Sequence, residues 1–240
     1  YLGGQAGAGA AADLLTGKVD PSGRLAETFP LVLADAPNAR YFPGRERTAE
    51  YREGLFVGYR YYQTVGKPVA FPFGFGLSYT TFAYSDLSVR REGVAFTLTN
   101  TGTRAGSEVA QVYLTGPRDR VFRPALELKG FQKVTLQPGE SRRVAIPLDG
   151  YAFRWFNPRT NQWEVEGGSY RISVGPNAGD LPLSAALEVE GIDPGAVYDK
   201  KTLACYFSGQ VEDVPDGAFQ ALLGRPIPEA KWDRSAPLTL

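Results

Sequence analysis

The residues best suited to bind a ligand lie within residues 31–53, a loop-rich stretch that mixes aromatic and charged side chains. Tyr41 and Phe42 supply flat apolar rings that could stack on a ligand. Arg45 and Arg52 supply guanidinium groups that could donate hydrogen bonds to it. A loop of this length in a compact protein is usually functional or lies against another domain. These four residues are therefore our candidate binding residues.

The absence of histidine and the single cysteine restrict the catalytic and metal chemistry that this sequence can support. It contains no histidine, which excludes a Ser-His-Asp site, a Cys-His site and any His-ligated metal within this chain. Cys205 is the one cysteine, so neither an internal disulfide nor a CxxC motif can form. A structural role for this thiol is favoured, because no His or second Cys can partner it. The sequence implies no metal and no organic cofactor.

Composition and charge indicate a folded protein that binds neither nucleic acid nor membranes. Apolar residues make up 43% of the chain, and 26 Lys and Arg residues balance 26 Asp and Glu residues. This neutral balance gives no attraction to nucleic acid or to an anionic membrane. No apolar run is long enough for a membrane-spanning helix. Because the sequence opens on Tyr1 without a signal-peptide pattern, we expect an interior point of a longer polypeptide; the location stays open, with the cytoplasm favoured.

Residues 1–70 mix a small-residue helix with loops. Residues 8–17 favour a short helix because alanine and leucine are good helix formers, and Gly17 stands where a C′ glycine would end it. Residues 24–30 are predicted to be extended. For residues 54–62 (GLFVGYRYY), the apolar pattern does not decide between a strand and a helical turn.

Residues 71–82 (FPFGFGLSYTTF) are predicted to form a domain junction, because a glycine-rich aromatic turn passes there into the start of a strand. Residues 83–190 then alternate apolar and polar positions in short segments separated by turns. This spacing predicts a two-sheet antiparallel β-sandwich. The predicted strands are residues 84–89, 94–100, 109–115, 126–136, 141–148, 152–156, 162–165, 169–174 and 183–189.

Residues 191–240 are predicted to form an extended tail with one short helix at residues 215–223. Gly224 would end that helix. Pro226 and Trp232 favour an extended strap beyond it. The tail has few apolar residues of its own, so it must lie along another surface to be ordered.

Several spaced motifs resemble glycoside hydrolase family 3. Residues 53–62 (EGLFVGYRYY) and residues 71–82 are similar to the block that leads, in that family, from the second domain into the third. Residues 4–25 contain GQAG, ADLLTG and PSGRL, which resemble the end of the family's α/β sandwich domain. The match continues into the family's fibronectin type III-like domain at residues 100–113, 126–131 and 138–140.

The resemblance implies a mainly β chain. An antiparallel fibronectin III-like β-sandwich at residues 83–190 would follow the terminal segment of an α/β sandwich domain at residues 1–70, with residues 71–82 as the junction and residues 191–240 as the tail.

The resemblance also implies a retaining hydrolase of β-linked glucosides or related sugars. In the family, an Asp on a (β/α)8 barrel is the nucleophile and a Glu in the α/β sandwich domain is usually the acid/base. No residue of this sequence matches either motif, so we assign no catalytic residue. The chain is expected to be inactive alone and to scaffold the N-terminal barrel and α/β domain. Those domains and the carbohydrate substrate are its expected partners, with Tyr41, Phe42, Arg45 and Arg52 at the rim of the active site.

Two other functions remain open at this stage. Phe153, Trp155, Phe156 and Trp163 could form a stacking platform of a stand-alone carbohydrate-binding module. Alternation places Phe153 and Trp155 on one face and Phe156 on the other, which favours packing in the core instead. A purely structural adhesion or dimerisation domain is the third alternative, because a fold does not dictate function.

Overall fold

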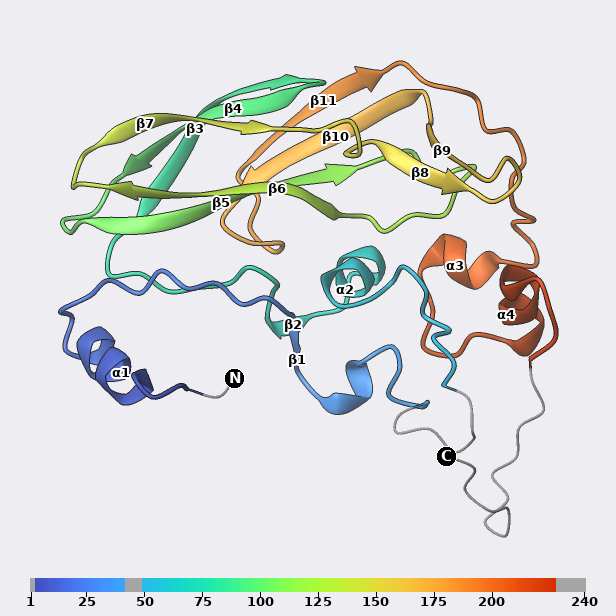
Figure 1. Cartoon of the computed structure of the whole chain (residues 1–240), viewed down its shortest axis with the longest axis horizontal. Helices are drawn as coiled ribbons and strands as arrows, with labels where there is room; N and C mark the ends of the chain where they lie inside the picture. The colour runs from blue at the N-terminus through green and yellow to red at the C-terminus, as the bar shows by residue number, and fades with distance from the viewer. Residues whose placement is uncertain (1–2, 42–48, 228–240) are drawn as a thin grey trace, which may run out of the picture.

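The structure is a computed structural model that describes residues 3–41 and 49–227. A β-sandwich forms the upper layer in Figure 1, and a layer of short helices and loops lies beneath it. Both ends of the described chain contribute to the lower layer. Among the described residues, no helix has the length and apolar character needed to cross a membrane.

The predicted two-sheet antiparallel sandwich is confirmed. One sheet has four strands in the order β11-β10-β5-β6, the other has three in the order β3-β4-β7, and every pairing between neighbours is antiparallel. β8 and β9 form a separate hairpin. The strands are β3 (Phe82–Arg90), β4 (Gly93–Asn100), β5 (Gly106–Thr115), β6 (Glu127–Leu136), β7 (Ser141–Pro147), β8 (Arg154–Asn157), β9 (Gln162–Val165), β10 (Gly168–Gly175) and β11 (Leu183–Val189).

The core of the sandwich follows from the alternation of apolar residues along each strand. On β4, Val94, Phe96 and Leu98 are buried and the residues between them are half-buried. Val112 on β5 and Ile172 on β10 enter the same core from the other sheet. Because side chains on a strand point to opposite faces in turn, each strand contributes one apolar row to this core.

The N-terminal segment forms a helix and a minimal sheet. α1 (Gly7–Leu15) ends where predicted, since Gly17 adopts the left-handed conformation with φ of 72°. β1 (Phe29–Pro30) pairs with β2 (Val69–Phe71), and a 3-10 turn, η1 (Leu33–Asp35), follows β1.

The segment that the sequence left undecided contains a helix. α2 (Tyr59–Val65) begins after Gly58, and Gly66 ends it in the left-handed conformation. Tyr61 and Tyr62 are buried against the tail. This packing stabilises the helix, because a helix of seven residues has little stability of its own.

The tail folds back as two short helices and is less extended than predicted. α3 (Ala204–Ser208) was not predicted, whereas α4 (Asp216–Leu223) agrees with the predicted helix and ends at Gly224. Tyr206 of α3 is buried in a cluster with Phe56, Tyr61 and Tyr62. The predicted dependence of the tail on another surface is therefore confirmed for residues up to 227. The predicted strap around Trp232 lies outside the described residues.

The glycine-rich turn of the junction packs against the backbone of the N-terminal segment and against β5. Leu25 exchanges backbone hydrogen bonds with the turn, donating to Phe75 and accepting from Gly74, both at 2.8 Å. Gly74 has a φ of 83°, and a Cβ at this position would overlap the side-chain amide of Gln111. Gln111 is buried and held by Tyr113, whose hydroxyl donates to its side-chain oxygen at 2.6 Å. Gly74 therefore fits where a larger residue would not.

A buried ion pair lies beside this turn. Arg24 donates to the carboxylate of Glu108 at 2.7 Å, and both side chains are at most 10% exposed. The same carboxylate accepts the backbone N–H of Val109 at 2.7 Å. The carboxylate of Glu108 thus joins the N-terminal segment to β5, because it accepts hydrogen bonds from Arg24 and from the backbone of β5.

We expect Gly74→Ala to lower the free energy of unfolding by roughly 2–4 kcal/mol, from backbone strain together with overpacking against Gln111. Gly139→Ala is the matched control. Gly139 has a similar φ of 73° but open space around it, so only the strain of about 1–2 kcal/mol should appear. Urea denaturation of both variants measures the difference, and equal losses would contradict the overlap.

Candidate functional site

The structure describes two of the four candidate binding residues, and it brings them together. Phe42 and Arg45 lie outside the described residues. The guanidinium carbon of Arg52 lies 5.3 Å from the centroid of the Tyr41 ring. The same carbon lies 5.1 Å from the centroid of the Phe219 ring in α4. Arg52 therefore lies close to an aromatic ring of the loop and to one of the tail.

The guanidinium of Arg52 is already hydrogen-bonded within the chain. Its Nε donates to the carboxylate of Glu50 at 2.6 Å, and its Nη1 donates to the carbonyl of Val214 at 2.8 Å and to the carboxylate of Asp216 at 2.6 Å. Burial lowers the pKa of Arg52, but the hydrogen bonds to Asp216 and Glu50 outweigh this effect and raise the pKa above its ordinary value. Arg52 is therefore a fixed charge that ties the loop to the start of α4.

A second charged contact joins the tail to the end of α2. Lys67 bonds Glu212 and also pairs with Asp35 at 3.1 Å, and Tyr61 donates its hydroxyl to Glu212 at 2.6 Å. Arg40 pairs with Asp213 at 2.6 Å nearby.

These hydrogen bonds shift the pKa values of the partners. The bonds from Lys67 and Tyr61 hold the pKa of the Glu212 carboxyl below its ordinary value. Burial and the hydrogen bond to Glu212 raise the pKa of Tyr61. The tail is thus held by two clusters of opposite charges, one on Arg52 and one on Lys67. Sequence reasoning missed these tail residues, because nothing local marks them as partners of the loop.

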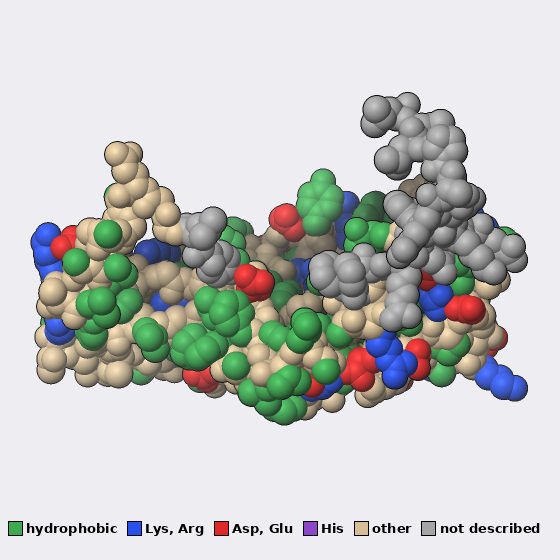
Figure 2. Space-filling model, turned by 90° about the horizontal axis from the view of Figure 1, so that it is seen from below, with side chains coloured by type: hydrophobic (Ala, Val, Ile, Leu, Met, Phe, Trp, Pro, Cys, Tyr) green, Lys and Arg blue, Asp and Glu red, His purple; other side chains and the backbone are tan. Residues whose placement is uncertain are grey.

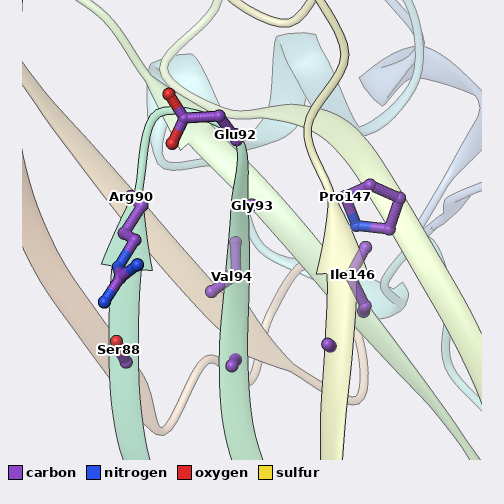
Figure 3. Close-up of a pocket in the computed structure, with 9 residues that line it drawn as sticks. Ser88, Arg90, Glu92, Gly93, Val94, Ile146 and Pro147 are labelled. Atoms are coloured by element: carbon purple, nitrogen blue, oxygen red, sulfur yellow. The ribbon is translucent and has the colours of Figure 1, made fainter.

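A hollow in the described surface lies elsewhere, on the outer face of the sheet β3-β4-β7. It has a volume of about 670 Å³ and small lining side chains such as Ser88 and Ala95. Figure 3 shows Glu92 at the turn between β3 and β4, with Arg90 on β3 and Pro147 across the hollow on β7. Its lining residues do not include any from the loop of residues 31–53. The hollow is therefore not the site formed by the candidate residues.

The aromatic residues of the β8–β9 region divide into two groups. Phe153 and Trp155 are buried, with 5% and 7% of their surface exposed. Phe156 and Trp163 are 42% and 63% exposed. Packing in the core is therefore confirmed for Phe153 and Trp155. For Phe156 and Trp163 the prediction is wrong, because both rings point outward from the β8–β9 hairpin.

Two family descriptions cover most of the chain and agree with the observed fold. Residues 1–79 match the glycosyl hydrolase family 3 C-terminal domain, and residues 108–178 match the fibronectin type III-like domain. The combination of a family 3 C-terminal domain match with a fibronectin III-like sandwich thus defines the C-terminal portion of a class of glycoside hydrolases.

Curated relatives and solved structures lead to the same family. Thermostable beta-glucosidase B of Acetivibrio thermocellus is 44% identical over 238 residues, which cover 95% of this chain and 31% of the relative. The exo-alpha-(1->6)-L-arabinopyranosidase of Bifidobacterium longum is 39% identical, and the match covers 95% of this chain and 33% of that protein. The crystal structure of a GH3 beta-glucosidase from Bifidobacterium adolescentis has a TM-score of 0.75 at 44% identity, covering 78% of this chain and 29% of that one.

The chain belongs to glycoside hydrolase family 3, and it carries matches to the family's C-terminal domain and to the fibronectin type III-like domain. The resemblance seen in the sequence is confirmed. The chain spans about a third of the length of the curated relatives it matches.

We expect Glu212→Gln to lower stability at pH 7 by less than about 1 kcal/mol, a small loss because the carboxylate is 41% exposed and screened by water. The pKa of the Glu212 carboxyl is lower in the folded than in the unfolded protein, where it is near 4.5. The carboxylate therefore stabilises the fold at pH values above this unfolded pKa. The contribution is lost as the pH falls through the folded-state pKa. The stability difference between wild type and variant should therefore shrink below pH 4.5.

Denaturation at pH 7 and at decreasing pH values measures this difference. Glu188→Gln on β11, an exposed carboxylate, is the control and should show no such trend. A constant difference between wild type and Glu212→Gln at all pH values would contradict the charge contact.

Proposed function

We propose that this chain is the C-terminal scaffolding portion of a retaining family 3 glycoside hydrolase that acts on β-linked glucosides or related sugars. In this proposal, the Asp nucleophile and the Glu acid/base belong to upstream segments of the enzyme. The β-glucosidase name of the Acetivibrio relative supports the reaction class. The arabinopyranosidase name of the Bifidobacterium relative indicates that sugar and linkage vary among similar proteins, so the exact substrate stays open.

The observation that carries the proposal is that the N-terminal segment buries little of its own surface. None of the nine residues of α1 is buried. β1 is two residues long, and its partner β2 is three residues long. A two-stranded ribbon of this size is marginal by itself, so this segment needs strands and helices from another part of the enzyme.

An exposed apolar surface on the same segment provides the place for that contact. Figure 2 shows hydrophobic side chains gathered on the lower face of the molecule. Contiguous exposed apolar surface usually marks an interface. We assign this face to the upstream barrel and α/β domain. The exposed large apolar residues of the N-terminal segment and junction include Leu15, Val19, Leu31, Val32, Leu33, Phe71 and Leu77.

The tail has a defined part in this proposal. It holds Arg52 through Val214 and Asp216, and Arg52 in turn lies against the ring of Tyr41. We propose that the loop approaches the rim of the active site, where Tyr41, Phe42 and Arg45 contact a distal sugar. The sequence places Arg52 among these contact residues as well. Its hydrogen bonds to Val214 and Asp216 support a second role, in which Arg52 positions the loop.

The 240-residue chain alone should give no turnover of nitrophenyl β-glucoside, because the proposed nucleophile and acid/base are upstream. Adding the separately expressed upstream portion should restore activity, since the apolar face would then be covered. The measurement is nitrophenolate release with and without that portion. Turnover by the chain alone would overturn the assignment of catalysis to upstream residues.

In the full-length enzyme, Tyr41→Ala should raise KM for oligosaccharides several-fold and leave KM for a nitrophenyl monosaccharide nearly unchanged, because the loop would contact only a distal sugar. Asp216→Asn keeps Arg52 but weakens its hold on the tail. A similar KM change in this variant would show that Arg52 acts by positioning the loop. Unchanged oligosaccharide kinetics in both variants would remove the loop from the substrate site. Arg171→Ala, at an exposed residue of β10 in the sandwich, is the control.

A further inference from the structure

Two aromatic side chains of the β8–β9 hairpin point outward together. Phe156 and Trp163 are directly paired across the two strands. Their ring centroids are 5.5 Å apart and the rings meet edge to face at 68°. Trp163 is 63% exposed, whereas Trp155 on the other face of the hairpin is 7% exposed. Since tryptophan is highly buried on average, so exposed an indole points to a binding role.

Tyr151 and Arg154 extend this surface. Arg154 lies two residues before Phe156 on β8, so the two side chains share one face of the hairpin. The guanidinium carbon of Arg154 lies 4.6 Å from the centroid of the Tyr151 ring, and Tyr151 is 70% exposed. We call Tyr151, Arg154, Phe156 and Trp163 the aromatic patch. It offers three rings and one guanidinium on a continuous stretch of surface.

A hollow of about 160 Å³ adjoins the aromatic patch. Val165 lines this hollow. It is the cross-strand partner of Arg154. It also lies two residues after Trp163 on β9, a distance of about 7 Å along the strand. The hollow is also lined by Glu92 and Asp149. Glu92 lines the larger hollow of Figure 3 as well, so the two hollows are neighbours.

This combination of groups suits a sugar better than a protein partner. Flat rings can stack on the C–H faces of a pyranose, and the carboxylates of Glu92 and Asp149 and the guanidinium of Arg154 can bond its hydroxyls. Protein interfaces are enriched in aromatic residues and arginine but depleted of glutamate and aspartate, whereas Glu92 and Asp149 line the hollow beside the rings here. An extended β-linked glucose chain presents flat ring faces one after another, which suits rings set along a hairpin.

We propose that the aromatic patch and the adjoining hollow form a carbohydrate-binding site for short β-linked glucose oligosaccharides. Trp163 and Tyr151 provide the stacking faces, and Arg154, Glu92 and Asp149 provide the hydrogen bonds. Binding at this site requires no turnover. Its test is therefore independent of the turnover test, and either proposal can fail without the other.

The test is calorimetric titration of the 240-residue chain with cellotetraose, followed by a titration monitored through the indole N–H signals in NMR. Saturable binding is expected, with the signal of Trp163 shifting and that of buried Trp155 unchanged. Trp163→Ala should bind about tenfold more weakly, because one stacked ring is lost. Phe131→Ala, which removes a ring 66% exposed on β6, is the matched control and should keep wild-type affinity. Maltotetraose, whose α-linked chain is curved, should bind more weakly.

Three outcomes would overturn the proposal. They are the absence of saturable heat with cellotetraose, equal affinity in wild type and Trp163→Ala, and self-association in sedimentation that Trp163→Ala abolishes. The last result would make the aromatic patch an interface between copies of the chain. The NMR arm uses the unmodified protein, so a shift of Trp155 without Trp163 also counts against the site, even if Trp163→Ala fails to fold.

Discussion

The placement of the sandwich on the N-terminal segment depends on the close approach of the junction turn to β5. Gly74 leaves room for the amide of Gln111, and beside it Arg24 from the N-terminal segment meets Glu108 of β5 in a buried ion pair. A buried pair of this kind adds little net stability, but it is costly to break, because the remaining charge would lack a partner. This contact therefore fixes which faces of the two parts meet.

The lower layer extends the same principle through contacts between segments far apart in sequence. Arg52 bonds the carbonyl of Val214 across 162 positions, and Tyr206 donates its hydroxyl to the carbonyl of Arg52 at 2.9 Å. The apolar cluster of α2, α3 and α4 excludes water from this region, which strengthens the charged contacts at its edge. The tail thereby holds Arg52 in place through both its side chain and its backbone carbonyl.

The N-terminal segment and the β8–β9 hairpin expose surfaces of different chemical composition. The N-terminal segment presents exposed aliphatic and aromatic residues around its two-stranded sheet. The β8–β9 hairpin presents rings interspersed with charges. In the proposed function the first surface joins the chain to the rest of the hydrolase, while the second stays open to sugar. The contribution of this chain to hydrolysis is then one of placement.

The sequence by itself determined the family, the sandwich and the ends of α1 and α4. Alternation is a local property of each strand, and Gly17 and Gly224 end their helices through backbone conformations that glycine adopts without strain. Only the tertiary structure decided that residues 59–65 are helical and that α3 forms. The two helices bury their side chains against each other, so neither is specified by its own sequence alone. It also decided that Arg52 faces Asp216 and that Trp163 is exposed while Trp155 is buried. These outcomes depend on which distant segments meet, and no local pattern of residue types encodes that.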